Sequence, residues 1–80
     1  MGTELLLSKL DKLHSTPLGL ERIRLNLNLK TDNVVDWCRA KIEDPRSEIC
    51  QKGKNWYITA DTCVITVNIN RYTIITAHTR

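Results

Sequence analysis

The pattern of apolar residues changes from helical to extended near the middle of this chain, and that change limits the possible folds more than any other feature. In the first half, leucine, isoleucine and valine recur at helical spacings, which place them on one face of each helix. In the second half, β-branched and aromatic residues dominate short runs, which is typical of strands. The sequence therefore predicts an α+β fold in which helices precede an antiparallel sheet.

Three N-terminal helices are expected, and the second and third have clear start or stop signals. Thr16 suits the N-cap of the second helix, because Pro17 then occupies its first turn, where no backbone N–H is needed. Thr31 or Asp32 caps the third helix, and Pro45 ends it. The expected helices cover residues 3–13, 17–26 and 33–43, with apolar faces formed by Leu6, Leu10, Leu13, Leu20, Ile23, Leu27, Val34, Val35, Cys38 and Ile42.

A meander of three or four antiparallel strands is expected in the second half of the chain. The strong candidates are the runs 55–60, 62–68 and 71–78, which are rich in β-branched and aromatic residues. Residues 48–50 allow a short fourth strand at the edge. All three helices are expected to pack on the apolar face of this sheet.

The register of the last two strands decides which side chains share that apolar face. If Ile69 and Asn70 form a two-residue turn, Cys63 faces Thr76 across the pair. A loop that is two residues longer makes Cys63 and His78 direct partners. Because side chains alternate along a strand, both registers place Cys63 and His78 on the same face.

Composition and length exclude several classes of protein. A chain of 80 residues has room for one domain, expected over residues 1–80, and not for a separate cofactor domain. No apolar run approaches the roughly 20 residues that a membrane span needs. Because no signal peptide is visible and the three cysteines are an odd number, we expect a cytoplasmic protein with reduced thiols. A formal net charge of +3 permits a nucleic-acid partner without arguing for one.

Cysteine and histidine residues that share the helix-facing side of the sheet predict a structural zinc site. Cys38 lies on the apolar face of the third helix, where it can meet Cys63 and His78. The candidate fourth ligand is His14 or a water molecule. Zinc takes thiolate and imidazole ligands in a tetrahedron, and it would help so small a domain to hold together. Cys50 adjoins the turn before the second strand, roughly 17 Å from Cys63 in a regular meander, and is therefore the doubtful ligand. The competing interpretation is that the buried cysteines only pack as small apolar residues.

A toxin-like RNA-binding or ribonuclease domain is the alternative function. Such domains place basic, hydroxyl and imidazole groups on a sheet, where they activate a 2′-hydroxyl and stabilise the phosphorane. Threonine and tyrosine are also what strand propensity alone selects, so the same pattern fits a purely structural strand. The last strand and one turn carry the candidates Arg71, Tyr72, Thr73, Thr76, His78, Lys52 and Lys54.

Several segments resemble a small domain family of unknown function found in bacteria, mainly Firmicutes, and their phages. The resemblance spans nearly the whole chain, and its polar positions include His14, Cys38 and His78. It supplies no established catalytic residues. The segments are Leu13–Thr16, Leu18–Ile23, Asn33–Cys38, Lys52–Tyr57, Val64–Asn68 and Tyr72–His78.

The phage distribution of that family implies a role in counter-defence. Phage-carried proteins of this size include a zinc-containing prophage inhibitor of the type II CRISPR nuclease. The resemblance therefore implies a non-enzymatic protein that binds this nuclease in the bacterial host cell and blocks the loading of target DNA. A DNA mimic should be strongly acidic, whereas this chain has a net charge of +3, so we expect it to bind a protein surface rather than nucleic acid. Enzyme activity is left open by the sequence.

Overall fold

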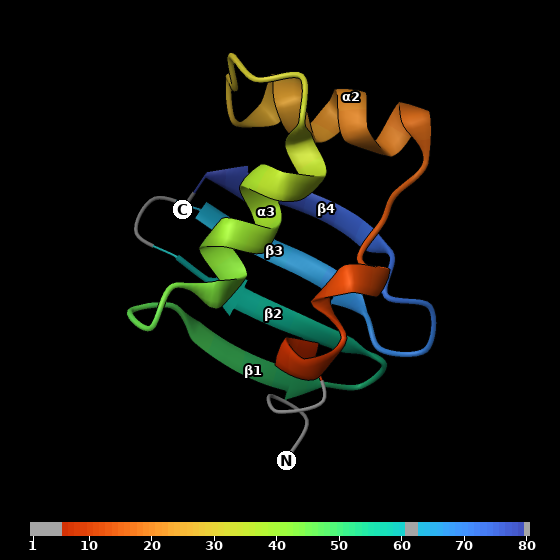
Figure 1. Cartoon of the computed structure of the whole chain (residues 1–80), viewed down its shortest axis with the longest axis vertical. Coiled ribbons are helices and arrows are strands. Elements are labelled where there is room, and N and C mark those ends of the chain that lie inside the picture. The colour runs from red at the N-terminus through yellow and green to blue at the C-terminus, as the bar shows by residue number, and fades with distance from the viewer. Residues whose placement is uncertain (1–5, 61–62, 80) are drawn as a thin grey trace.

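A four-stranded antiparallel sheet with the strand order β1-β2-β3-β4 forms one layer of the protein (Figure 1). The computed structural model describes residues 6–60 and 63–79. The predicted α+β class and the antiparallel meander are confirmed, and the edge strand is longer than expected. The strands are β1 (Glu48–Lys52), β2 (Asn55–Thr59), β3 (Cys63–Asn68) and β4 (Ile74–Thr79).

Helices α2 and α3 and a short 3₁₀ turn lie before the sheet in the described part of the chain. Helix α2 covers Pro17–Asn26, and the predicted cap is confirmed because the Thr16 hydroxyl accepts a hydrogen bond from Gly19 N at 3.0 Å. Helix α3 covers Val34–Glu43. Its N-cap is Asn33 rather than the predicted Thr31 or Asp32, because the Asn33 side chain accepts from Asp36 N at 3.3 Å. No described helix is long and apolar enough to cross a membrane.

The first predicted helix is interrupted. Residues 6–8 are helical, and a separate 3₁₀ turn, η1, covers Leu10–Lys12. Residues 3–5 of the prediction lie outside the described part of the chain. Leu6, Leu10 and Leu13 are nevertheless all buried, as the spacing predicts.

An apolar layer joins the helices to one face of the sheet, and Trp56 on β2 is its largest fully buried side chain. Figure 1 shows α3 crossing in front of the sheet, whereas α2 runs beside β4. The predicted packing of all three helices over one sheet face is therefore met only in part, because α2 flanks an edge. The buried apolar residues include Leu6, Leu10, Leu13, Ile23, Val34, Cys38, Ile42, Trp56, Ile58, Cys63, Ile65, Val67, Ile74 and Ala77.

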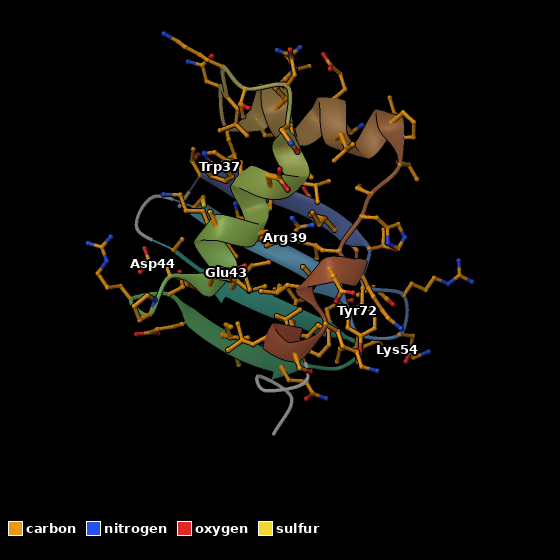
Figure 2. All side chains as sticks on the ribbon, in the orientation of Figure 1. Trp37, Arg39, Glu43, Asp44, Lys54 and Tyr72 are labelled. Atoms are coloured by element: carbon orange, nitrogen blue, oxygen red, sulfur yellow. The ribbon has the colours of Figure 1, made fainter. Side chains whose placement is uncertain are left out.

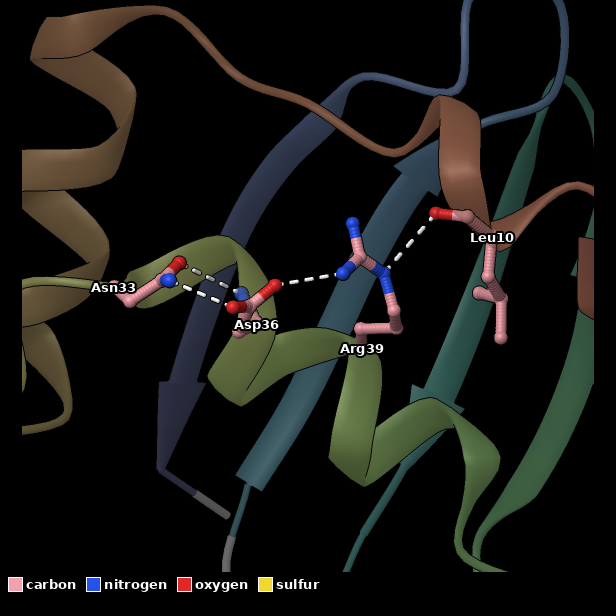
Figure 3. A network of polar contacts seen from close by, with 4 residues as sticks. All are labelled: Leu10, Asn33, Asp36 and Arg39. Atoms are coloured by element: carbon pink, nitrogen blue, oxygen red, sulfur yellow. Dashed lines mark hydrogen bonds and ion pairs between the residues drawn. The ribbon is translucent and has the colours of Figure 1, made fainter.

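Arg39 ties the N-terminal turns to α3 (Figure 3). Its Nε donates to the Leu10 carbonyl at 3.2 Å, and its Nη1 lies 2.6 Å from Asp36 Oδ1. The other oxygen of Asp36 accepts from the Asn33 side chain at 2.6 Å. One arginine thus satisfies a carbonyl of η1 and extends the capping network of α3.

The outer edge of β4 is covered by the segment that leads into α2. His14 N donates to the Tyr72 carbonyl at 3.2 Å, and Ile74 N donates to the His14 carbonyl at 2.8 Å. The Ser15 hydroxyl then donates to the Ile74 carbonyl at 2.9 Å. Farther along β4, the Asn26 side chain donates to the Ala77 carbonyl at 3.4 Å. These contacts satisfy an edge that would otherwise expose backbone groups.

The β3–β4 connection differs from the predicted two-residue turn. Asn68 N donates to the Thr73 carbonyl at 2.8 Å, so the loop comprises residues 69–72. Ile69 N donates to the Lys54 carbonyl at 2.9 Å, which holds this loop beside the β1–β2 turn; Lys54 and Tyr72 mark this end of the sheet in Figure 2. The Tyr72 backbone is left-handed, with φ of 55°. The centroid of the Tyr72 ring lies 5.7 Å from the centroid of the Trp56 ring.

A register shift between β3 and β4 makes one sequence-based prediction wrong. Thr66 pairs with Thr76, but Val67 pairs with Ile74, which leaves Ile75 as an extra residue in β4. Beyond this bulge, Cys63 pairs with Thr79 and Val64 pairs with His78. His78 therefore lies on the sheet face opposite Cys63, because alternate side chains point to opposite faces.

The Asn68 side chain should stabilise the loop that sets this register. Its Oδ1 accepts from Asn70 N and Arg71 N, both at 3.0 Å. We expect Asn68→Ala to lower the free energy of unfolding in urea by about 1 kcal/mol, because both bonds are lost. Asn68→Asp keeps the acceptor and should cost clearly less. Equal losses for the two variants would contradict this role.

Candidate functional site

Cys38 and Cys63 are the two predicted metal ligands that the structure brings together. Cys38 lies on α3 and Cys63 at the start of β3, and they are 0% and 1% exposed. Burial raises the pKa of Cys38 to about 12, and the neighbouring charge of Cys63 adds to that shift. Both thiols thus face the apolar layer between helix and sheet.

His14 lies at the outer edge of β4, and both of its ring nitrogens have partners. Nδ1 is 2.9 Å from the Lys12 carbonyl, which can only accept, so Nδ1 carries the proton. In the neutral ring Nε2 is then the acceptor, and it lies 3.2 Å from the Thr73 hydroxyl. This arrangement positions the segment that covers β4.

His78 does not join the cysteines either, because the bulge places it on the other face of the sheet, where it is exposed. Within residues 6–60 and 63–79, no three His, Cys, Asp or Glu side chains are placed so that they could hold a metal ion. The structure therefore does not gather Cys38, Cys63, His78 and His14 into one site. Zinc binding by the chain stays a prediction from the sequence, which metal analysis of protein purified without chelator would test.

The residues of the alternative ribonuclease site are divided between different surfaces. Tyr72 packs against Trp56 next to the apolar layer, and Thr73 contacts His14 at the β4 edge. Thr76 and His78 lie on the opposite face of the sheet. The last strand thus does not present the hydroxyl and imidazole groups of that prediction at one place.

One face of the sheet points away from the apolar layer, and we call its side chains the open face. Three rows of side chains cross it, because the register aligns residues of neighbouring strands. Thr66 is buried among its neighbours, and the others are partly or fully exposed. The open face comprises Glu48, Cys50, Lys52, Asn55, Tyr57, Thr59, Val64, Thr66, Asn68, Thr76 and His78.

Tyr57 occupies the middle of the open face. It pairs with Cys50 on one side and with Thr66 on the other, and Thr66 in turn pairs with Thr76. The Asn55 side chain lies 3.5 Å from the Tyr57 hydroxyl, within the same face. The centre of the open face is therefore a partly exposed ring surrounded by hydroxyl and amide groups.

The open face was not identified from the sequence, because the prediction placed the functional side chains on the covered face. One signal was present in the residues: Ile74 and Ala77 are both apolar and are three positions apart. A regular strand would point them to opposite faces, but both are buried. Ile75 and Ala77 would also fit a regular strand, so the spacing shows the bulge only together with the burial of Ile74. The bulge places Thr76 and His78 on the open face.

The fold and the open face define a small α+β domain in which helices cover one side of a four-stranded antiparallel meander. The chain belongs to a family described as a protein of unknown function, DUF3781, whose model matches residues 7–78. No curated protein and no solved structure matches the chain significantly.

The buried thiol of Cys38 should make the protein less stable in alkali. Its pKa of about 12 in the folded protein exceeds the ordinary value of 9.0, so the folded state holds this proton more tightly than the unfolded state does. This contribution is complete below pH 9 and is lost as the pH rises toward 12. Above pH 9, we expect the free energy of unfolding to fall more steeply for the wild type than for Cys38→Ala, by up to about 1.4 kcal/mol per pH unit.

Urea unfolding followed by tryptophan fluorescence at several alkaline pH values measures these slopes. Cys50→Ala is the matched control for removal of a thiol, because Cys50 is exposed and lies outside the apolar layer. Equal slopes for Cys38→Ala and the wild type would show that the Cys38 proton does not stabilise the fold.

Proposed function

We propose that this protein is a non-enzymatic binding module and that it contacts a protein partner through the open face. The observation that carries the proposal is the partly exposed ring of Tyr57 at the centre of a sheet face that faces away from the apolar layer. Tyrosine is frequent at the centre of protein interfaces because it supplies apolar area together with a hydroxyl. The surrounding threonines offer hydrogen bonds without the desolvation cost of a charge.

The charge of the open face favours a protein over a nucleic acid. Its ionisable side chains are Glu48, Cys50, Lys52, Tyr57 and His78. Lys52 is thus the one lysine on the open face, and none of the residues of this face is an arginine. Binding to nucleic acid depends largely on several lysines or arginines that neutralise phosphates. A nearly neutral face with hydroxyl groups suits the polar backbone and side chains of a protein surface better.

The partner-specific form of the proposal is inhibition of a type II CRISPR nuclease. It follows from the resemblance described for the sequence, and it places the protein in the cytoplasm of a bacterial host. The chain would bind the nuclease and block the loading of target DNA, with the open face as the contact surface. The net charge of +3 is consistent with binding a protein surface and disfavours mimicry of DNA.

Tyr57→Ala should weaken binding to the nuclease by about 30-fold, because removal of a central aromatic residue from an interface typically costs about 2 kcal/mol. Biolayer interferometry with the immobilised nuclease measures this change, and a DNA-cleavage assay with excess protein measures inhibition. Glu43→Ala is the matched control, since Glu43 is exposed on α3. It should bind as tightly as the wild type.

The same samples separate the proposal from its alternatives. Undiminished cleavage of DNA with excess wild-type protein would exclude the nuclease as the partner. Equal loss of affinity in the Tyr57 and Glu43 variants would exclude the open face as the contact surface. Degradation of RNA by the wild-type protein, but not by His78→Ala, would instead support the ribonuclease alternative.

A further inference from the structure

The two edge strands of the sheet, β4 and β1, differ in whether another segment covers them. The edge of β4 is covered by residues 14–26, as described above, whereas the described residues offer no such cover to β1. No backbone hydrogen bond joins Ile49 or Gln51 to a described segment outside the sheet. An uncovered strand edge is a template for pairing with another strand.

Hydrogen bonds on the far side of β2 show which groups of β1 point outward. Ala60 N donates to the Cys63 carbonyl, and Ile69 N donates to the Lys54 carbonyl, so the even-numbered residues of this stretch direct their backbone groups to β3. Backbone direction alternates along a strand, so Tyr57 directs its groups to β1, where it pairs with Cys50. The N–H and C=O groups of Ile49 and Gln51 consequently point away from the sheet.

We propose that β1 pairs with β1 of a second copy of this chain, antiparallel and centred on Cys50. In this register Ile49 of each copy lies opposite Gln51 of the other, and their outward backbone groups form hydrogen-bonded pairs. The two-fold axis passes between the two Cys50 residues and stands perpendicular to the sheet. Both open faces therefore lie on the same side of one continuous eight-stranded sheet.

The charges of β1 are complementary to themselves in this register. Glu48 of each copy lies opposite Lys52 of the other, on the open face and symmetrically about Cys50. Neither residue takes part in an ion pair among the described residues, and both are exposed. A shift of the register by two residues would remove both of these pairs. Opposite charges that face each other across strands stabilise pairing, whereas like charges oppose it.

Cys50 supplies a reporter for the contact. It is the exposed one of the three cysteines, whereas Cys38 and Cys63 are buried. Because the Cys50 backbone points to β2, the two Cys50 residues form a non-hydrogen-bonded pair, in which Cα atoms are about 4.5 Å apart. That spacing lies within the range that a disulfide bridges, about 4.4–6.8 Å.

Oxidation by diamide tests the register. Two Cys50 thiols lose two protons and two electrons, which reduce the diazene to a hydrazine, and one S–S bond forms. Non-reducing gel electrophoresis then measures the rate of dimer formation. The control is Cys50→Ser combined with Asn70→Cys, which moves the thiol from β1 to the exposed loop between β3 and β4. We expect the wild type to cross-link about tenfold faster than this control, because pairing holds the two thiols together.

Charge reversal tests the partner surface. Glu48→Lys and Lys52→Glu should each slow cross-linking about fivefold, because each places like charges opposite one another twice. The double variant Glu48→Lys/Lys52→Glu should restore the rate, and so should a mixture of the two single variants. Wild-type cross-linking no faster than the Asn70 control, or a double variant as slow as the single ones, would overturn the proposal.

Sedimentation equilibrium of Cys50→Ser supplies a measurement that is independent of the thiol. We expect its weight-average mass to rise from monomer toward dimer as the concentration increases. A monomer at every concentration would also overturn the pairing. The result does not depend on the nuclease, so it is separable from the outcome for the proposed function.

Discussion

The packing of Trp56 and its neighbours between the sheet and the helices is the interaction on which the rest of the structure depends. This short chain supplies helical segments to cover one face of a four-stranded sheet, and Trp56 is the largest side chain that they bury there. Its indole nitrogen has no hydrogen-bond partner among the described residues, a cost that the large buried area offsets. The helices cover only one face of the sheet, so the open face on the other side carries polar side chains.

Much of the fold could be predicted from the residues because the signals were local. Pro17 and Thr16 mark the start of α2, and the leucines of the first turns are buried as their spacing requires. The signals that determine the register of β4 were not local. The register depends on the loop that Asn68 closes and on the extra residue Ile75, and one extra residue moves every later side chain to the other face. That extra residue places His78 on the sheet face opposite Cys63, a position that the sequence could not predict.

Pairing through the uncovered edge of β1 would also change the size of the open face. A stable protein interface usually covers about 800 Å² on each partner. Four strands of about five residues offer an area of roughly 17 by 15 Å, which is well below that size. Pairing through β1 would place two open faces side by side and double the flat surface centred on Tyr57. The doubled face measures roughly 500 Å², so pairing brings the flat surface closer to the size of a usual interface.

Amide hydrogen exchange at β1 tests most directly whether one chain leaves this edge free for a partner. In dilute protein, the amides of Ile49 and Gln51 should exchange fast while that of Cys50, which is bonded to β2, exchanges slowly. Protection of Ile49 and Gln51 should then grow with protein concentration. Slow exchange of all three amides in dilute solution would contradict the account, because it would mean that a single chain already covers the edge.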